Sequence, residues 1–148
     1  MNLDPANPVV ALCAEGMQQE GIPGAAKKCF EEAWAIRRDD VDASIAAHFL
    51  ARHQATPADT LRWNRLALQH AQAVSDARTE SFMASLYLNL GDSLLATGAI
   101  DEANRSLAHA RHWLATLPAS GYRDLVARGI EGLATRIHVA LPATTPQP

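Results

Sequence analysis

The segment Ala47–Gln54 (AHFLARHQ) places His48, Arg52 and His53 close together in the chain. Each of these side chains can donate or accept hydrogen bonds, and an arginine can hold a carboxylate through two parallel contacts. These side chains could therefore hold a peptide backbone or a carboxylate. The structural reading is the stronger of the two, because the helix dipole favours cations at the end of a helix.

The six histidines raise the question of metal-dependent chemistry. His109 and His112 share one helix face, but such a pair supplies two ligands, whereas a zinc site needs three or four. The sequence contains no HExxH, CxxC, GxGxxG, GxxxxGK[ST] or GxSxG motif. We expect no catalytic residue, metal or cofactor. The alternative is an accessory subunit of an enzyme, or a histidine-based metal-dependent enzyme.

The composition is that of a globular chain with a mixed surface: 48% hydrophobic, 20% charged and a net charge of −3. A nucleic-acid-binding domain would show a basic face, so we expect no nucleic-acid partner. Cys13 and Cys29 fall in apolar stripes and read as small buried side chains. The first residues do not resemble a signal peptide, and no apolar run approaches about 20 residues. We expect a cytoplasmic protein with no membrane partner.

The pattern of apolar residues and helix breakers predicts an all-α chain. Asn7-Pro8 and Thr56-Pro57 are typical helix starts, with a capping residue followed by a proline. The expected helices span residues 8–20, 24–38, 41–54, 57–75, 78–96, 100–116 and 121–141. Short connections favour antiparallel neighbours. Residues 142–148 (PATTPQP) are expected to form a disordered tail.

An internal repeat supports this assignment. Residues 87–110 contain eight small or apolar residues at characteristic spacing: Tyr87, Leu90, Gly91, Leu94, Gly98, Ala103, Leu107 and Ala110. Subtracting 77 from each number gives eight more small or apolar residues near the N-terminus: Val10, Cys13, Ala14, Met17, Gly21, Ala26, Phe30 and Ala33. The offset is about nine residues longer than two standard 34-residue repeats. We expect the excess in the middle hairpin, where Ala47, Leu50, Ala51, Trp63 and Ala67 are the matching positions.

Tyr87-Leu90-Gly91-Leu94 and Ala103-Leu107-Ala110 resemble the signature of the tetratricopeptide repeat family. The resemblance implies three antiparallel helical hairpins in one domain, residues 1–141, with repeats at about 7–40, 41–83 and 84–117. Residues 121–141 would form a capping helix, as the ends of repeat stacks require. The same helix could instead form the interface of a structural homo-oligomer.

The resemblance also implies a role as a scaffold that binds a protein or peptide. In that family the first helix of each hairpin lines a concave groove, and residues beside the packing positions point into it. The expected groove residues are Glu15, Gln18, His48, Arg52, His53, Ser85, Asn89 and Asp92. We expect a monomer or weak homodimer whose partner is a protein or peptide.

Overall fold

The computed structural model describes residues 3–141, and every regular element in that range is helical. The prediction of an all-α chain is therefore confirmed. Expected and observed ends differ most at two C-termini, by three residues (38 against 35, 54 against 51). The predicted tail, 142–148, lies outside the described residues. The helices are α1 Pro8–Gln18, α2 Ala25–Ala35, α3 Asp40–Ala51, α4 Pro57–Ala73, the 3₁₀ turn η1 Ala77–Thr79, α5 Glu80–Ala96, α6 Ile100–Thr116 and α7 Gly121–Ala140.

Polar side chains before the helices fix where several of them begin. The Asn7 carboxamide oxygen accepts a hydrogen bond from the Val9 backbone N–H at 2.8 Å, and Thr56 accepts one from the Asp59 N–H at 3.1 Å. Both caps were predicted from the sequence. Asp39 before α3 and Ser120 before α7 do the same for Asp42 and Arg123. Each such cap satisfies a backbone donor that the helix itself leaves unpaired.

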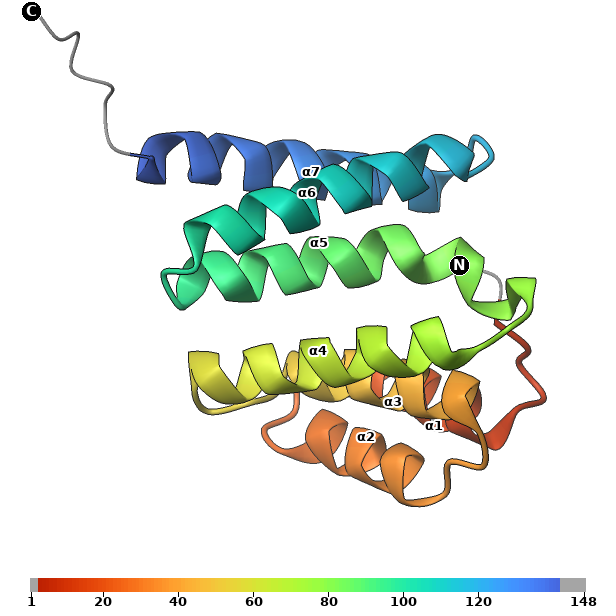
Figure 1. Cartoon of the computed structure of the whole chain (residues 1–148). Helices are drawn as coiled ribbons and strands as arrows, with labels where there is room; N and C mark the ends of the chain where they lie inside the picture. Colours follow the sequence, from red (N-terminus) through yellow and green to blue (C-terminus); the bar gives the residue numbers. More distant parts are fainter. Residues whose placement is uncertain (1–2, 142–148) are drawn as a thin grey trace, which may run out of the picture.

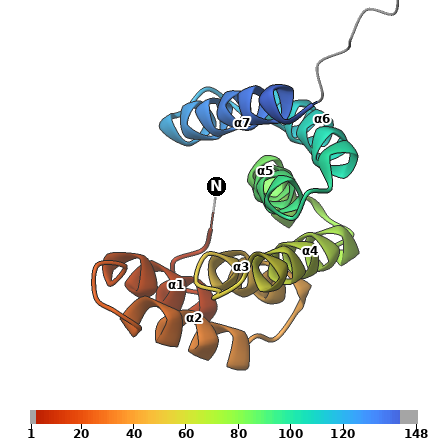
Figure 2. The same ribbon diagram turned by 90° about the vertical axis from the view of Figure 1, so that its left-hand side faces the viewer.

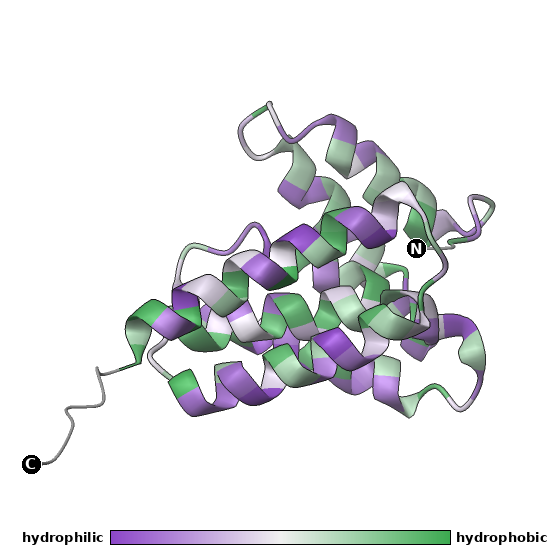
Figure 3. Ribbon diagram, turned by 90° about the horizontal axis from the view of Figure 1, so that it is seen from above, coloured by the Kyte–Doolittle hydropathy of each residue, from purple (hydrophilic) through white to green (hydrophobic). Residues whose placement is uncertain are grey.

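Successive helices pack against each other as a curved row. Figure 1 shows α2 to α7 following one another across the molecule, with α1 behind α2 and α3, and Figure 2 shows the row from its side. In that view α1, α3, α5 and α7 follow the inner side of the curve, and α2, α4 and α6 lie outside. Each helix in Figure 3 carries both polar and apolar residues, as expected for helices with one face in a core.

The core consists of two apolar clusters that meet at α5. The first joins α1 to α4 with the start of α5, around Phe30 and Phe82. The second joins α5, α6 and α7, where α7 contributes its buried stripe of Val126, Ile130, Leu133 and Ile137. Tyr87, Leu90 and Trp113 pack against both clusters. No helix among the described residues is both long and apolar enough to cross a membrane.

The 77-residue offset correctly pairs the buried positions of α2 with those of α6, the second helices of the first and third hairpins. It is wrong for part of the first hairpin's first helix and for the turn that follows it. Ala26, Phe30 and Ala33 are buried like their counterparts in α6. Met17 is 45% exposed, however, whereas its counterpart Leu94 is buried. The left-handed turn glycine also differs: Gly98 has φ +82°, but in the first hairpin this conformation falls on Gly24 and not on Gly21. The cause is the connection, since residues 19–24 join α1 to α2 where residues 97–99 join α5 to α6.

The middle hairpin is longer than the first, but its second helix is no longer than that of the third, since α6 also has 17 residues. Helix α4 has 17 residues where α2 has 11, and residues 74–79, including η1, connect it to α5. The matching positions Ala47, Leu50, Ala51 and Ala67 are buried, and Trp63 is partly buried. α1 packs on α3, and α5 packs on α7, but α3 and α5 make few close backbone approaches. Side chains from several helices instead surround a cavity at this place.

Candidate functional site

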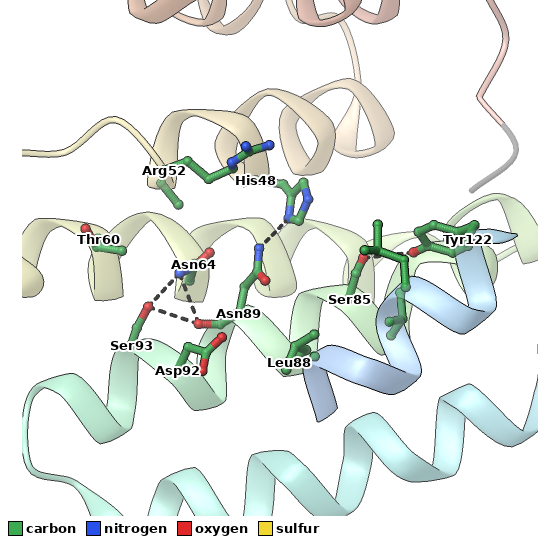
Figure 4. A pocket seen from close by; sticks show the side chains of 14 residues that line it. His48, Arg52, Thr60, Asn64, Ser85, Leu88, Asn89, Asp92, Ser93 and Tyr122 are labelled. Atoms are coloured by element: carbon green, nitrogen blue, oxygen red, sulfur yellow. Dashed lines mark hydrogen bonds between the residues drawn. The ribbon is translucent and has the colours of Figure 1, made fainter. Parts of the chain in front are cut away.

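A cavity of about 520 Å³ opens between α3, α4, α5 and α7; we refer to it as the central cavity. Its volume falls within the ~300–1,000 Å³ typical of ligand sites. Figure 4 shows its side chains in two groups. Polar residues from α3, α4 and α5 gather on one side, and α7 meets Leu88 of α5 on the other. We describe these as the polar half and the apolar half.

The polar half is organised around His48 and Asn89. The Asn89 side-chain nitrogen lies 3.4 Å from His48 Nδ1, which links α3 to α5 across the cavity (Figure 4). Burial, and secondarily the charge of Arg52, lowers the pKa of His48 to about 4. The imidazole is therefore neutral near pH 7. A neutral ring carries one hydrogen-bond donor and one acceptor.

Asn64 of α4 anchors the floor of this half. Its side-chain nitrogen donates to Ser93 Oγ at 2.6 Å and to the Asn89 backbone carbonyl at 3.2 Å. Ser93 Oγ in turn donates to the same carbonyl at 3.0 Å. These bonds attach α4 to α5 beneath Asn89 and hold its backbone in place. A buried, mutually bonded set of this kind orients the side chain above it.

The apolar half is built by α7 against α5. Leu88, Leu125, Val126 and Gly129 line it. Leu125 is 61% exposed despite its size, so its side chain lacks an apolar cover within the described residues. At the rim, the Tyr122 hydroxyl donates to Ser85 Oγ at 3.0 Å, which ties the start of α7 to α5 (Figure 4). Burial raises the pKa of Tyr122, and the bond to Ser85 partly offsets this.

The two charged residues that line the cavity each have a partner of opposite sign. Arg52 forms an ion pair with Glu20 at 2.8 Å, and Asp92 accepts from Arg136 of α7 at 2.5 Å. Burial raises the pKa of Asp92, while Arg136 acts in the opposite direction. The cavity therefore presents dipoles and apolar surface, with its charges already compensated.

Five of the eight expected groove residues line the central cavity: His48, Arg52, Ser85, Asn89 and Asp92. They come from α5, from α3 and, for Arg52, from the C-cap of α3, where the register of the sequence pattern holds. Their role in binding a partner stays a prediction.

The other three expected residues lie outside the cavity. Glu15 and Gln18 are exposed on α1, where Glu15 accepts from Gln19. His53 follows the last residues of α3, and its ring packs on Phe30 of α2 at 5.1 Å. Even in a continuous helix, position 53 would lie about 100° from Arg52 and about 140° from His48, so it does not share their inner face.

Sequence reasoning missed several lining residues. Ser93 had a signal, because Ser85, Asn89 and Ser93 recur every four residues among apolar neighbours on α5. Asn64 lies beside Trp63 without any such pattern. Tyr122 and Leu125 belong to the helix for which the sequence indicated a capping role or an oligomer interface. Nothing in their spacing indicates which of them faces α5.

A second buried polar cluster lies at the start of α3. Asp42, 1% exposed, accepts from the Asn7 side chain at 2.6 Å and from the Arg38 backbone N–H at 3.0 Å. Arg38 Nε adds a contact at 3.2 Å. The carboxylate thereby fastens the start of α1 and the α2–α3 connection to α3. We assign this cluster a structural role, since its donors and acceptors satisfy one another.

The remaining candidate residues also have structural partners. Trp63 packs edge-on against Trp34 at 5.0 Å between ring centroids. Cys13 and Cys29 are free and buried, and burial, with a smaller effect of Cys29, raises the pKa of Cys13 to about 12. Within residues 3–141, no three His, Cys, Asp or Glu side chains gather as metal ligands would.

Comparison with known proteins does not assign the chain to a family. No family model matches the chain, and neither a curated protein nor a solved structure matches it.

Proposed function

We propose that this protein is a tetratricopeptide-like helical scaffold that binds a protein or peptide segment in the central cavity. The observation that carries the proposal is the meeting of four helices around one cavity that combines hydrogen-bonding side chains with an exposed leucine. Partner sites of this kind pair a few oriented polar groups with an apolar surface.

The arrangement of bonds around the cavity supports binding by a preformed site. Asn64 and Ser93 hold the α5 backbone under Asn89, and Tyr122 holds α7 at Ser85. A partner would therefore meet side chains whose positions are set before it arrives. Preorganisation lowers the entropic cost of binding on the scaffold's side.

Selection from a random 12-residue peptide library on the immobilised protein tests the proposal. We expect enriched peptides that share a sequence pattern. The double variant Arg52→Ala/Asn89→Ala should bind them at least about tenfold more weakly, since truncating a central interface residue typically costs more than 1 kcal/mol. Its helicity should stay unchanged, because the Arg52–Glu20 pair is half exposed and exposed pairs contribute little.

The matched control is Asn104→Ala/Arg105→Ala, which removes the same two residue types from an exposed part of α6. The control should bind the selected peptides like the unmodified protein. A folded Arg52→Ala/Asn89→Ala variant with unchanged affinity would remove the cavity as the binding site. A library without any enriched peptide would contradict the function itself.

A further inference from the structure

The pair of His48 and Asn89 offers unused hydrogen-bonding capacity to the cavity. Asn89 Nδ2 donates to His48 Nδ1, so the proton of the neutral ring sits on Nε2. Among the described residues neither His48 Nε2 nor the Asn89 carboxamide oxygen takes part in a hydrogen bond. The pair thus presents one donor and one acceptor.

This complementarity does not depend on how the two side chains are oriented. If the carboxamide is turned over, its oxygen accepts from His48 Nδ1–H instead. The ring nitrogen Nε2 then becomes the acceptor, and the carboxamide NH₂ becomes the donor. One donor and one acceptor are in both cases the complement of the backbone of one residue, which carries one N–H and one C=O.

The apolar half adjoins this pair, since Leu88 and Asn89 of α5 both line the central cavity. Gly129 brings α7 close at this point: a Cβ placed on it would lie 2.6 Å from Leu88 Cδ2. Leu88, Leu125 and Val126 consequently form an apolar seat next to the hydrogen-bonding pair. Covering an exposed leucine with an apolar side chain of a partner is favourable, at about 25 cal/mol per Å² of surface removed from water.

The charges at the cavity argue for a neutral occupant at this seat. Arg52 and Asp92 are matched by Glu20 and Arg136, and His48 is neutral. A charged side chain entering the apolar half would lose hydration without gaining an unpaired counterion.

Building on the proposed function, we propose that the central cavity reads one residue of an extended partner segment by two features together. The backbone N–H and C=O of that residue bind His48 and Asn89, and its apolar side chain, of leucine size, enters the seat formed by Leu88, Leu125 and Val126. The specificity is therefore for a neutral apolar residue in a peptide, and not for a charged one.

The test uses single-residue peptide mimics and the full-length protein. N-acetyl-leucine N-methylamide carries both features, its glycine analogue carries the amide alone, and the aspartate and lysine analogues carry a charge. Methyl and side-chain amide NMR signals report the two halves separately. We expect the leucine probe to shift signals of Leu88, Leu125 and Asn89, and to bind about tenfold more tightly than the other three, the effect of burying a good part of one apolar side chain.

Two variants on α7 make the test specific. Leu125→Asn should abolish the preference for the leucine probe over the glycine probe, because it makes the seat polar. Val139→Asn is the matched control, since Val139 is 78% exposed on the same helix and does not line the cavity. It should leave the preference unchanged, and both variants should fold because both side chains are exposed.

The outcomes separate this inference from the proposed function. Equal binding of the aspartate or lysine probe, or an unchanged preference in Leu125→Asn, overturns the inference. If the selected library peptides still bind through His48 and Asn89 in that case, the scaffold function stands without the apolar specificity. If the library yields no peptide, the function fails on its own test, whatever the probes do.

Discussion

At the residue scale, Asn89 has two roles in the central cavity. Its backbone carbonyl is fixed from below by Asn64 and Ser93, and its side chain reaches His48 on the neighbouring α3. Because the backbone is held, the side chain has few ways to turn without losing the contact to His48. A binding group held in this way keeps its direction in the absence of a ligand.

His48 should make the stability depend on pH. Its pKa is about 4 in the folded chain, below the ordinary value of 6.5. The unfolded chain therefore takes up the proton first as the pH falls. The contribution of the neutral His48 to the free energy of unfolding is fully present above pH 6.5. It is lost as the pH falls toward 4, and the loss amounts to roughly 3 kcal/mol at most. His48→Gln should flatten the free energy of unfolding between these values, measured by urea titration.

The control for this prediction is His138→Gln, at an exposed position near the end of α7. Comparing each variant with the unmodified chain cancels the carboxylates that titrate in the same range. A His48→Gln variant with the same pH slope as the His138→Gln variant would contradict the assignment of the slope to His48.

Asp42 is the residue whose loss should cost the most polar stabilisation. Replacing it by alanine leaves the Asn7 carboxamide and the Arg38 N–H without their buried acceptor. We expect Asp42→Ala to lower the free energy of unfolding by about 2–3 kcal/mol. Asp40→Ala, two residues earlier, removes a half-exposed contact with His70 and should cost less than about 1 kcal/mol. Equal losses in urea titrations of the two variants would refute the role of the Asp42 cluster.

At the element scale, the sequence predicted the helices well and the connections poorly. The span of α6, residues 100–116, agrees at both ends. On α5 the three residues that the family resemblance implied, Ser85, Asn89 and Asp92, all line the cavity, because side chains four or three residues apart share a helix face. The prediction for the α1–α2 connection was wrong because more than one of its glycines could form the left-handed turn. The sequence favours Gly21, and the structure has it at Gly24.

The residues that α7 contributes to the central cavity were also not predicted from the sequence. Its apolar stripe predicts that it packs, but not which neighbouring residues face the cavity. That depends on the approach of Gly129 to Leu88, a contact between distant parts of the chain. Tyr122 and Leu125 therefore become visible as site residues only when α7 is placed against α5.

Two glycines of α7 should respond differently to substitution by alanine. A Cβ on Gly132 meets open space, whereas one on Gly129 meets Leu88 Cδ2 at 2.6 Å. Gly132→Ala should raise the free energy of unfolding by about 0.5–1 kcal/mol, the gain in helix propensity. Gly129→Ala should lose that gain, because the Leu88 side chain must move. Thermal unfolding of both variants checks this, and equal stabilisation would show that the approach of α7 to α5 is loose.

At the scale of the whole molecule, α5 joins the two halves of the core. Phe82, Met83 and Leu86 belong to the first cluster, and Leu88 and Leu94 belong to the second. The helix packs on α4, α6 and α7, whereas α1 packs on α2 and α3. Exposing the backbone amides of α5 to solvent thus requires both apolar clusters to open. Exposing the backbone amides of α1 requires only the first cluster to open, at one end of the molecule.

Native-state hydrogen exchange should reflect this order. We expect the amides of α5 to exchange slowest, with a free energy equal to that of global unfolding, and those of α1 to exchange through a smaller opening.

Phe30→Ala, in the first cluster, should lower protection in α1 and α2 more than in α6 and α7. Ile130→Ala, buried in the second cluster, should do the reverse. Each substitution removes a buried side chain, at a cost of about 2–5 kcal/mol. Equal loss of protection along the whole chain in both variants would show that the two clusters open together. The central cavity, which lies where α3 and α5 face each other, would then sit within one cooperative unit and not at the joint between two.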